Sequence, residues 1–373
     1  MSRENSEELL VDAFGGGVKE DDYAYLMTEF GIERIQNLLP EISEPHFYMT
    51  RGVMFGHTDL GRILEAIQKN RPFAVMTGIK PSSYYHLGSF ITATEVIYFQ
   101  SLGAHVSFCI ADLESYADGR QTPQETTKYA IDNIADVLAL GLDPKRAYIY
   151  RQSEDMDVLR LGSLFAAHVT YNMMKGLYGE RSFGHYHSAL IQAGDILLPQ
   201  LERFGGPKPT VTPVGADQAP HARLTRDLAK KEVFQNHYRF VPSGFTFHLL
   251  LKGLDGSDKM SKRTPMSFFN FQDEDTLIKQ KMMNAFTGGR DTVDEQRQLG
   301  GRPDICRNFD LGKFFFIPSD KELSDLREEC MSGRLLCGEC KLRMFERVIE
   351  FKHRHNAKKE KLQDMARVIV LGE

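Results

Sequence analysis

Two lysines, Lys259 and Lys262, flank a methionine–serine pair in the glycine-rich stretch GLDGSDKMSKRTP. Charged, glycine-rich stretches of this kind are usually solvated loops that connect two elements. Two ammonium groups on such a loop acquire a chemical use only if other parts of the chain supply a site for an anion. The significance of this loop therefore depends on what the rest of the sequence contains.

A second stretch, KPSSYYHLGS, carries groups that suit a phosphate. The Pro-Ser-Ser run at residues 81–83 can begin a helix, whose free backbone N–H groups and dipole favour an anion. His86 can donate a hydrogen bond to a phosphoryl oxygen, and the missing side chain at Gly88 lets a flat group such as adenine lie on the backbone. A histidine beside a leucine is more often packed in a core, so this stretch alone is weak evidence for a site.

Four of the five cysteines gather near the C-terminus in the pattern C-x23-C-x6-C-x2-C. They are Cys306, Cys330, Cys337 and Cys340. A cytosolic protein does not normally hold disulfides, and four thiolates that include a C-x2-C pair suit a tetrahedral zinc ion or an iron–sulfur cluster. The alternative is four reduced thiols, the last two merely one helical turn apart. Cys109 stands alone in the apolar run VSFCIA and is expected to be a buried small side chain.

Composition and charge indicate an ordinary globular protein with room for two domains. The chain has 373 residues, of which 42% are hydrophobic and 26% charged, and its formal net charge is −5. It is therefore not a polycation, and any contact with a nucleic acid must come from a local basic patch. The polar N-terminus has no basic segment followed by an apolar run, and no stretch reaches the length of a membrane span. We expect a cytoplasmic protein.

Strands and helices alternate through the first two-thirds of the sequence. Apolar runs predict strands near residues 73–78, 105–112, 146–150 and 209–217, and helical spacing predicts helices near residues 89–103, 122–141 and 220–231. Thr122, Pro123 and Glu125 suit the start of the second of these helices, and Gly141 suits its end. The alternation predicts a doubly wound, parallel, Rossmann-like α/β domain.

The sequence divides into three expected parts. Residues 1–44 form a polar helical extension, residues 45–265 form the α/β domain, and residues 266–373 form an α-helical domain. The second boundary is placed where strand signals give way to helical periodicity.

The ordered pair of HLGS and, about 170 residues later, KMSKR resembles the two signature motifs of class I aminoacyl-tRNA synthetases. In that family the carboxylate of an amino acid attacks the α-phosphate of ATP, pyrophosphate leaves and an aminoacyl-adenylate remains. Positioning and charge stabilisation then provide most of the catalysis. Lysines on a mobile loop can close onto the charge that develops on pyrophosphate in the transition state.

This resemblance implies that His86, Ser89, Lys259 and Lys262 are catalytic. The sequence departs from the family pattern at Ser89, where that pattern has a second histidine. A hydroxyl can still donate a hydrogen bond, so we expect redistributed contacts rather than loss of activity. The departure also leaves room for a non-catalytic relative.

Further segments resemble the tryptophanyl/tyrosyl subgroup and, within it, archaeal and eukaryotic tryptophanyl-tRNA synthetases. They are HFYMTRGVMFGHTDLGRIL, TPVGADQAPHARLTRD, AFTGGRDTVDEQRQLGG and SGRLLCGECK. The likeness covers roughly residue 45 to the C-terminus. It implies ATP with Mg²⁺, L-tryptophan and tRNA(Trp) as ligands, and a homodimer. It also implies that residues 45–265 are catalytic, with a dimer-forming insertion, and that residues 266–373 bind the anticodon.

The resemblance further implies two sets of binding residues. Those expected around ATP are Thr77, Gly78, Gly88, Gly215, Asp217, Met260 and Ser261. Those expected around tryptophan are Met76, Glu114, Gln192, Asp195 and Gln218. Asp195 stands where the family has an acidic partner for the ring donor of the substrate, and a carboxylate can accept from an indole N–H or a phenol O–H. Met76 favours tryptophan, because tyrosyl enzymes have there a tyrosine that bonds the substrate hydroxyl, whereas methionine packs on an aromatic ring.

The C-terminal segment carries two further implied functions. The four-cysteine pattern resembles the cluster-binding pattern of some bacterial tryptophanyl enzymes, with one more residue in the first gap, and favours an iron–sulfur cluster over zinc. A basic helical run follows, in which Lys352, Arg354, Lys358, Lys359 and Lys361 can contact tRNA phosphates.

Three alternative functions stay open: a tyrosyl enzyme, another kind of nucleotidyltransferase, and a non-catalytic tRNA-binding paralogue. Met76 and the C-terminal segments count against the first. The long helical domain and the KMSKR segment count against the second. The third rests on Ser89 alone, and the intact KMSKR segment opposes it.

Overall fold

The computed structural model describes residues 23–372 apart from 118, 120, 259 and 261–263. Within these residues, seven strands form one sheet in the order β1-β2-β7-β6-β3-β4-β5. Their bounds are β1 Glu33–Arg34, β2 Met54–Thr58, β3 Ala74–Ile79, β4 His105–Ile110, β5 Ala147–Arg151, β6 Thr210–Gly215 and β7 Gly244–His248. The five strands from β7 to β5 are parallel, and β2 and β1 extend them antiparallel. The predicted doubly wound α/β fold is confirmed.

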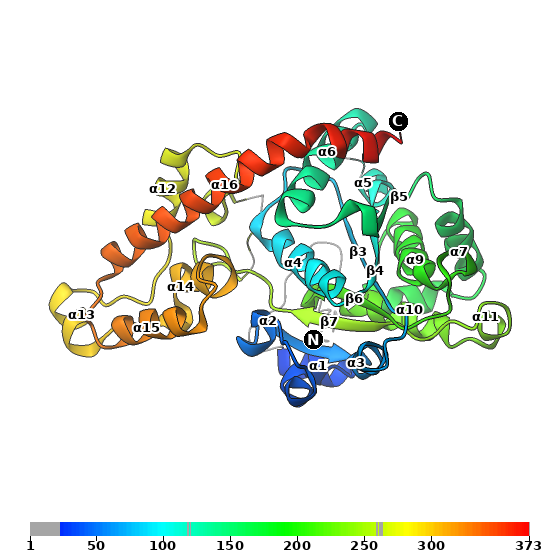
Figure 1. Ribbon diagram of the computed structural model, residues 1–373, viewed down its shortest axis with the longest axis horizontal. Coiled ribbons are helices and arrows are strands. Elements are labelled where there is room, and N and C mark those ends of the chain that lie inside the picture. Colours follow the sequence, from blue (N-terminus) through cyan, green and yellow to red (C-terminus); the bar gives the residue numbers. More distant parts are fainter. Residues whose placement is uncertain (1–22, 118, 120, 259, 261–263, 373) are drawn as a thin grey trace, which may run out of the picture.

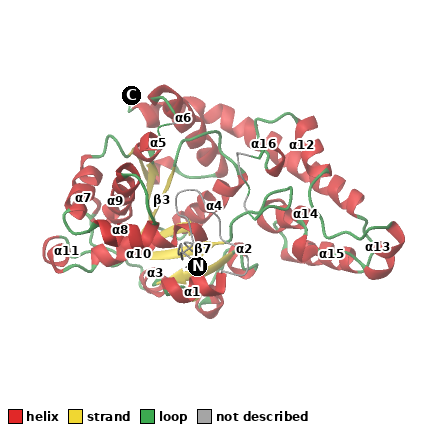
Figure 2. Ribbon diagram, turned by 180° about the vertical axis from the view of Figure 1, so that it is seen from behind, coloured by secondary structure: helices red, strands yellow, loops and turns green. Residues whose placement is uncertain are grey.

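Helices cover both faces of this sheet (Figures 1 and 2). Those of the first two-thirds of the chain are α1 Tyr23–Phe30, α2 Phe47–Thr50, α3 Leu60–Gln68, α4 Leu87–Ser101, α5 Asp112–Ala117, α6 Pro123–Leu140, α7 Met156–Ala166, α8 Tyr171–Tyr178, α9 Phe183–Leu197, α10 Ala219–Ala229 and α11 Glu232–His237. Side chains alternate along β3, so Val75 belongs to the core under α4 and α6, whereas its neighbour Met76 belongs to the core that includes α9. The face under α9 is the one that carries the predicted tryptophan residues.

The helix α6 follows its sequence signals closely. Thr122 and Glu125 form a complete capping box, Pro123 is the first helical residue and Gly141 ends the helix with a φ of 120°. The strands β3 to β6 and the helix α10 were likewise predicted within a few residues.

The predicted helix start at residues 81–83 is wrong. The helix α4 begins at Leu87, and the five residues before His86 form no helix. His86 has extended backbone angles and forms an isolated bridge with Asn270. Because His86 is held in this bridge, the helix begins only at the next residue, inside the HLGS segment.

Three strands, β1, β2 and β7, were not predicted. β7 lacks an apolar run because Thr246 and His248 interrupt it, and these polar side chains are buried against Glu95 and Thr92 of α4. β1 lies inside the segment expected to be a helical extension and pairs with β2. Residues 1–22 of that extension lie outside the described part of the chain.

The described residues beyond 265 contain helices but no strand. These helices are α12 Asp275–Met283, α13 Val293–Leu299, α14 Arg307–Leu311, α15 Asp320–Met331 and α16 Cys337–Leu371. The 35-residue helix α16 starts among the C-terminal helices and runs back to pack along α6 (Figure 1). It therefore joins the helical part to the sheet domain, across the predicted boundary. Within the described ranges, no helix is both long and apolar enough to cross a bilayer.

Buried ion pairs fasten α16 to α6. Lys359, only 5% exposed, contacts Asp132 and Asp136 at 2.8 Å each. His355 lies 2.8 Å from the other oxygen of Asp136. Lys352 is likewise buried and bonds Asp275 and the carbonyl of residue 273. The prediction that Lys352 and Lys359 face tRNA is therefore wrong, since intramolecular partners bury both ammonium groups.

The variant Asp136→Asn is expected to lower the free energy of unfolding by about 3 kcal/mol, because it removes one partner of a buried ion pair. Denaturant unfolding followed by circular dichroism gives this value. The matched control is Glu350→Gln on the exposed side of α16, whose 3.9 Å pair with Arg354 should contribute under about 0.5 kcal/mol. Equal losses in both variants would contradict a special role for the buried pair.

Candidate active site

A pocket of about 240 Å³ opens at the carboxyl ends of the parallel strands β3, β4, β5 and β6. All five residues of the predicted tryptophan set line it, namely Met76, Glu114, Gln192, Asp195 and Gln218. Three of the predicted ATP residues, Thr77, Gly78 and Gly215, line it as well. Ligands of open α/β sheets bind at this edge, so the fold brings these residues together where a site is expected.

Glycines shape the strand ends around the pocket. A Cβ at Gly78 would lie 3.0 Å from the Cβ of Cys109 on the neighbouring strand. A Cβ at Gly215 would lie 2.7 Å from Oδ1 of Asp217, which is buried in the short turn after β6. Thr77 donates a hydrogen bond to the carbonyl of Pro213 and so ties β3 to β6. The backbone at this edge is thus closely packed and lacks side chains at Gly78 and Gly215.

The HLGS segment lies at the N-terminus of α4. A Cβ at Gly88 would lie 2.9 Å from Cε1 of His86, so glycine lets the imidazole fold over the first turn. The Oγ of Ser89 lies 3.5 Å from Nε2 of His86, and the N–H of Ser89 donates to the carbonyl of residue 86. None of these three residues lines the pocket itself.

The second signature segment is described only in part. Met260 is buried, and its N–H donates to the carbonyl of Leu251. Lys259, Ser261 and Lys262 lie outside the described residues.

The inner end of the pocket holds a buried carboxylate. Asp195 is 1% exposed, and burial raises its pKa to about 7. Tyr150 donates to its Oδ1 at 2.8 Å, Gln152 donates to its Oδ2, and the thiol of Cys109 is a third partner. Such bonds are required, because an unpaired buried carboxylate is strongly unfavourable.

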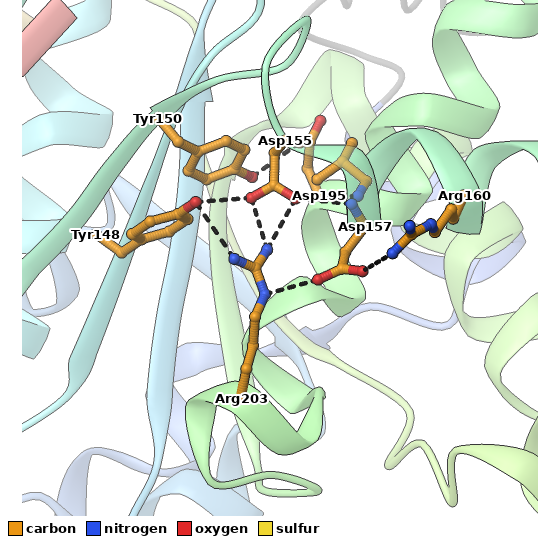
Figure 3. A network of polar contacts seen from close by, with 8 residues as sticks. Tyr148, Tyr150, Asp155, Asp157, Arg160, Asp195 and Arg203 are labelled. Carbon is orange, nitrogen blue, oxygen red and sulfur yellow. Dashed lines mark hydrogen bonds and ion pairs between the residues drawn. The ribbon is translucent and has the colours of Figure 1, made fainter. Parts of the chain in front are cut away.

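A second layer of polar contacts holds Tyr150 from behind (Figure 3). The rings of Tyr148 and Tyr150 stack with centroids 5.0 Å apart. The hydroxyl of Tyr148 donates to Asp155 at 2.8 Å, and Arg203 bonds both oxygens of that carboxylate. The tyrosine that faces Asp195 is therefore fixed by stacking and by an anchored neighbour.

The outer part of the pocket is also polar. Lys80 and Glu114 face each other at 3.3 Å, and both are partly exposed. The side-chain amide of Gln192 on α9 donates to the side chain of Gln218 at 3.4 Å. Cationic, anionic and amide groups thus lie together in this part of the pocket.

Among the residues that sequence analysis missed are Lys80, Cys109 and Gln152, which line the pocket, and Tyr150, which donates to Asp195. Cys109 was correctly expected to be buried, but its contact with Asp195 was not foreseen. Tyr150 ends a predicted strand and Gln152 follows it. Their place at a carboxyl strand end was the available signal.

The four C-terminal cysteines come together at one small cavity of about 20 Å³. Cys306 precedes α14, Cys330 lies near the end of α15, and Cys337 and Cys340 lie in the first turn of α16. Within the described part of the chain, no group of three or more histidine, cysteine or acidic side chains is arranged to hold a metal ion. The residues are thus gathered, but not in the geometry of a preformed single-ion site.

Comparison with known proteins identifies the family to which this chain belongs. The chain matches the family described as class I tRNA synthetases (W and Y) over residues 68–352, and it belongs to that family.

Its similar relatives over nearly the full length are tryptophan–tRNA ligases. That of Archaeoglobus fulgidus is 37% identical, and the match covers 94% of this chain and 97% of that protein. That of Aeropyrum pernix is 39% identical, with 94% and 95% covered. The crystal structure of tryptophanyl-tRNA synthetase from Aeropyrum pernix superposes with a TM-score of 0.89 at 38% identity, and covers 96% of this chain and 99% of that one.

Proposed function

We infer that this protein is a tryptophan–tRNA ligase. It activates L-tryptophan with ATP to tryptophanyl-adenylate and pyrophosphate, and then transfers the tryptophanyl group to tRNA(Trp). The observation that carries this conclusion is the similarity to tryptophan–tRNA ligases, which extends over nearly the whole of each chain.

We propose that ATP lies over the carboxyl ends of β3 and β6. Thr77, Gly78, Gly88, Gly215, Asp217, Met260 and Ser261 would surround it. The close backbone at Gly78 and Gly215 supports this assignment. Mg²⁺ would enter with ATP and supply charge neutralisation on the phosphates.

In this proposal the reaction needs no covalent intermediate on the protein. The substrate carboxylate attacks the α-phosphate, and the electron pair of the broken bond leaves with pyrophosphate. His86 and Ser89 would donate hydrogen bonds to phosphoryl oxygens, and Lys259 and Lys262 would stabilise the departing charge. Contacts that strengthen as this charge develops raise the rate rather than ground-state affinity.

Tryptophan would occupy the inner part of the pocket, between Met76, Glu114, Gln192, Asp195 and Gln218. Met76 is buried and lines this part, so its thioether can pack on an aromatic ring. The same side chain offers no strong partner to a phenol hydroxyl. This contact favours tryptophan over tyrosine.

ATP–pyrophosphate exchange with each amino acid added singly tests the function. Exchange is expected with tryptophan alone, and Lys262→Ala is expected to lower kcat about 100-fold. Lys358→Ala, which removes an exposed lysine on α16, is the matched control and should leave exchange unchanged. Exchange supported by tyrosine would contradict the substrate, and tRNA binding without any exchange would favour a non-catalytic paralogue.

We also propose that two copies of the chain associate through the insertion between β5 and β6. Large apolar side chains are exposed there on neighbouring helices: Met156 and Leu164 on α7, Tyr171 and Met173 on α8, and Phe183 on α9. Phe183 is 84% exposed. A second copy is the proposed partner because the resemblance implies a symmetric homodimer, whose interface pairs one patch with itself.

Sedimentation velocity is expected to give about twice the mass of one chain for the wild type. Phe183→Glu should shift the distribution toward the monomer, because it places a charge in the apolar contact. Val368→Glu, at an exposed apolar residue of α16, is the control and should remain dimeric. A monomeric wild type at micromolar concentration would contradict the proposal.

We propose that the four-cysteine cavity holds an iron–sulfur cluster rather than zinc. Four thiolates can bind either group, and the cluster is preferred because the cysteine spacing resembles the cluster-binding pattern of some bacterial tryptophanyl enzymes. A Cβ at Gly289 would lie 3.0 Å from the Sγ of Cys337, and one at Gly301 would lie 2.7 Å from the Sγ of Cys330. Glycines thus make room for the sulfur atoms, which supports a designed ligand set.

Anaerobically purified protein is expected to contain about four iron and four sulfide ions per chain. Cys340→Ser should lose most of this iron, whereas Cys109→Ser, at the cysteine outside the cavity, should retain it. A measured content of one zinc per chain would show that a single zinc ion occupies the cavity and would contradict the cluster. The absence of both metals would show four reduced thiols.

The tRNA would then approach the helical part of the chain. With Lys352 and Lys359 buried, the exposed basic residues of the α16 run are Arg354, Lys358 and Lys361. They would contact phosphates, which gives affinity without sequence choice.

We further propose a role for each part of the chain. Residues 45–265 form the catalytic domain, residues 266–373 include the anticodon-binding region, and residues 1–44 precede both as an extension. We also propose that the protein acts in the cytoplasm.

A further inference from the structure

Lys80 brings a positive charge into a pocket that otherwise holds carboxyl groups. Among the described residues that line the pocket, Lys80 is the one cation, and Glu114 and Asp195 are the two carboxylic acids. The Nζ of Lys80 lies 3.3 Å from Oε1 of Glu114, and the two side chains are 22% and 28% exposed. An ion pair whose members keep contact with solvent contributes little to stability. The stability of the fold therefore gives little reason for a lysine in this pocket.

The backbone around Lys80 is fixed on both sides. The carbonyl of Ile79, the last residue of β3, accepts the N–H of Ala111 at 2.8 Å, and the carbonyl of Lys80 accepts the N–H of Ser82 at 2.8 Å. The ammonium group reaches Glu114 on α5, the helix that follows the neighbouring strand β4. The positive charge is thus held beside the carboxyl ends of two paired parallel strands.

The pair of Lys80 and Glu114 is complementary in charge to an α-amino acid. Tryptophan carries an ammonium and a carboxylate on one carbon atom, and the pair presents a carboxylate and an ammonium side by side. An ammonium only donates hydrogen bonds and an ionised carboxylate only accepts them. Each charge of the substrate therefore has one partner of opposite sign in the pair, namely Glu114 for the ammonium and Lys80 for the carboxylate.

We propose that the ammonium group of Lys80 binds the carboxylate of tryptophan and is a catalytic group of the activation step. This inference rests on the proposed function and adds to it the residue that holds the nucleophile. One carboxylate oxygen forms a bond to the α-phosphorus, and the bond from that phosphorus to the bridging oxygen breaks, so that its electron pair leaves with pyrophosphate. Lys80 donates hydrogen bonds and transfers no proton.

The need for a cation at this point follows from the charges of the two reactants. The carboxylate and the α-phosphate are both anionic, so they repel each other as they approach. An ammonium group fixed beside the carboxylate lowers this repulsion and keeps the attacking oxygen in place. Mg²⁺ on the phosphates does not perform this task, because it enters with ATP rather than with the amino acid.

The test compares the dissociation constants of L-tryptophan and of tryptamine, which lacks the carboxylate, by isothermal titration calorimetry on the full chain. Lys80→Met removes the charge and keeps the apolar part of the side chain. It is expected to weaken tryptophan binding by about 10- to 100-fold, because a charge-assisted hydrogen bond is lost. Tryptamine binding should not weaken, which also shows that the pocket of the variant is folded.

Two further variants serve as matched comparisons. Lys80→Arg keeps a positive charge and should retain most of the tryptophan affinity and of the ATP–pyrophosphate exchange that Lys80→Met loses. Lys145→Met removes an exposed lysine at the amino end of β5, on the opposite edge of the sheet, and should change neither ligand.

Glu114→Gln provides the reciprocal test. Both ligands carry the ammonium group, so this variant should weaken tryptophan and tryptamine together. A loss confined to tryptophan is therefore expected at Lys80 and not at Glu114.

An equal change for both ligands in Lys80→Met, including a common loss through poor folding, would overturn the proposal. Unchanged tryptophan binding together with a higher KM for ATP would also overturn it, because Lys80 would then serve the phosphates alone. A wild type that neither binds tryptophan nor shows tryptophan-dependent exchange would overturn the proposed function as well. Normal exchange in the wild type with an unselective Lys80→Met would overturn this inference alone, so the two failures are distinguishable.

Discussion

The active-site pocket depends on the parallel pairing of β3 with β4 and with β6. This pairing brings the carboxyl ends of three strands to one edge, where Gly78 and Gly215 keep the backbone open. Alternation along the strands then places Met76 and Cys109 on the face that α9 covers. Since α9 also carries Asp195, one hydrogen-bonding pattern sets both ends of the pocket, the glycine-lined strand ends and the buried carboxylate.

At the inner end of the pocket, two successive shells of polar side chains surround Asp195. A carboxylate at that depth is tolerated because Tyr150, Gln152 and Cys109 donate to it. Behind them, Arg203 fixes Asp155 (Figure 3). Networks of this kind are rigid when every member has a partner.

Sequence reasoning succeeded where the signal was local. The capping box of α6 and the apolar run of β3 each determine an element without distant help. β7 was not predicted, because its buried polar side chains find their hydrogen-bond partners on α4, far away in the sequence. The same limit explains Lys359, whose charge pointed to tRNA although its carboxylate partners lie more than 200 residues earlier. Gln152 could not be singled out, because the feature that marks it is a hydrogen bond to Asp195, which lies 43 residues later in the sequence.

The path of α16 has a consequence for the order in which the protein is made. Lys359 of this helix comes 223 residues after Asp136, yet α16 covers α6 and brings Lys359 to Asp132 and Asp136. Domains generally fold as their residues leave the ribosome, N-terminal parts first. A nascent chain of this protein would expose that face of α6 and carry two uncompensated carboxylates until α16 emerges, so the sheet domain is covered only at that late stage.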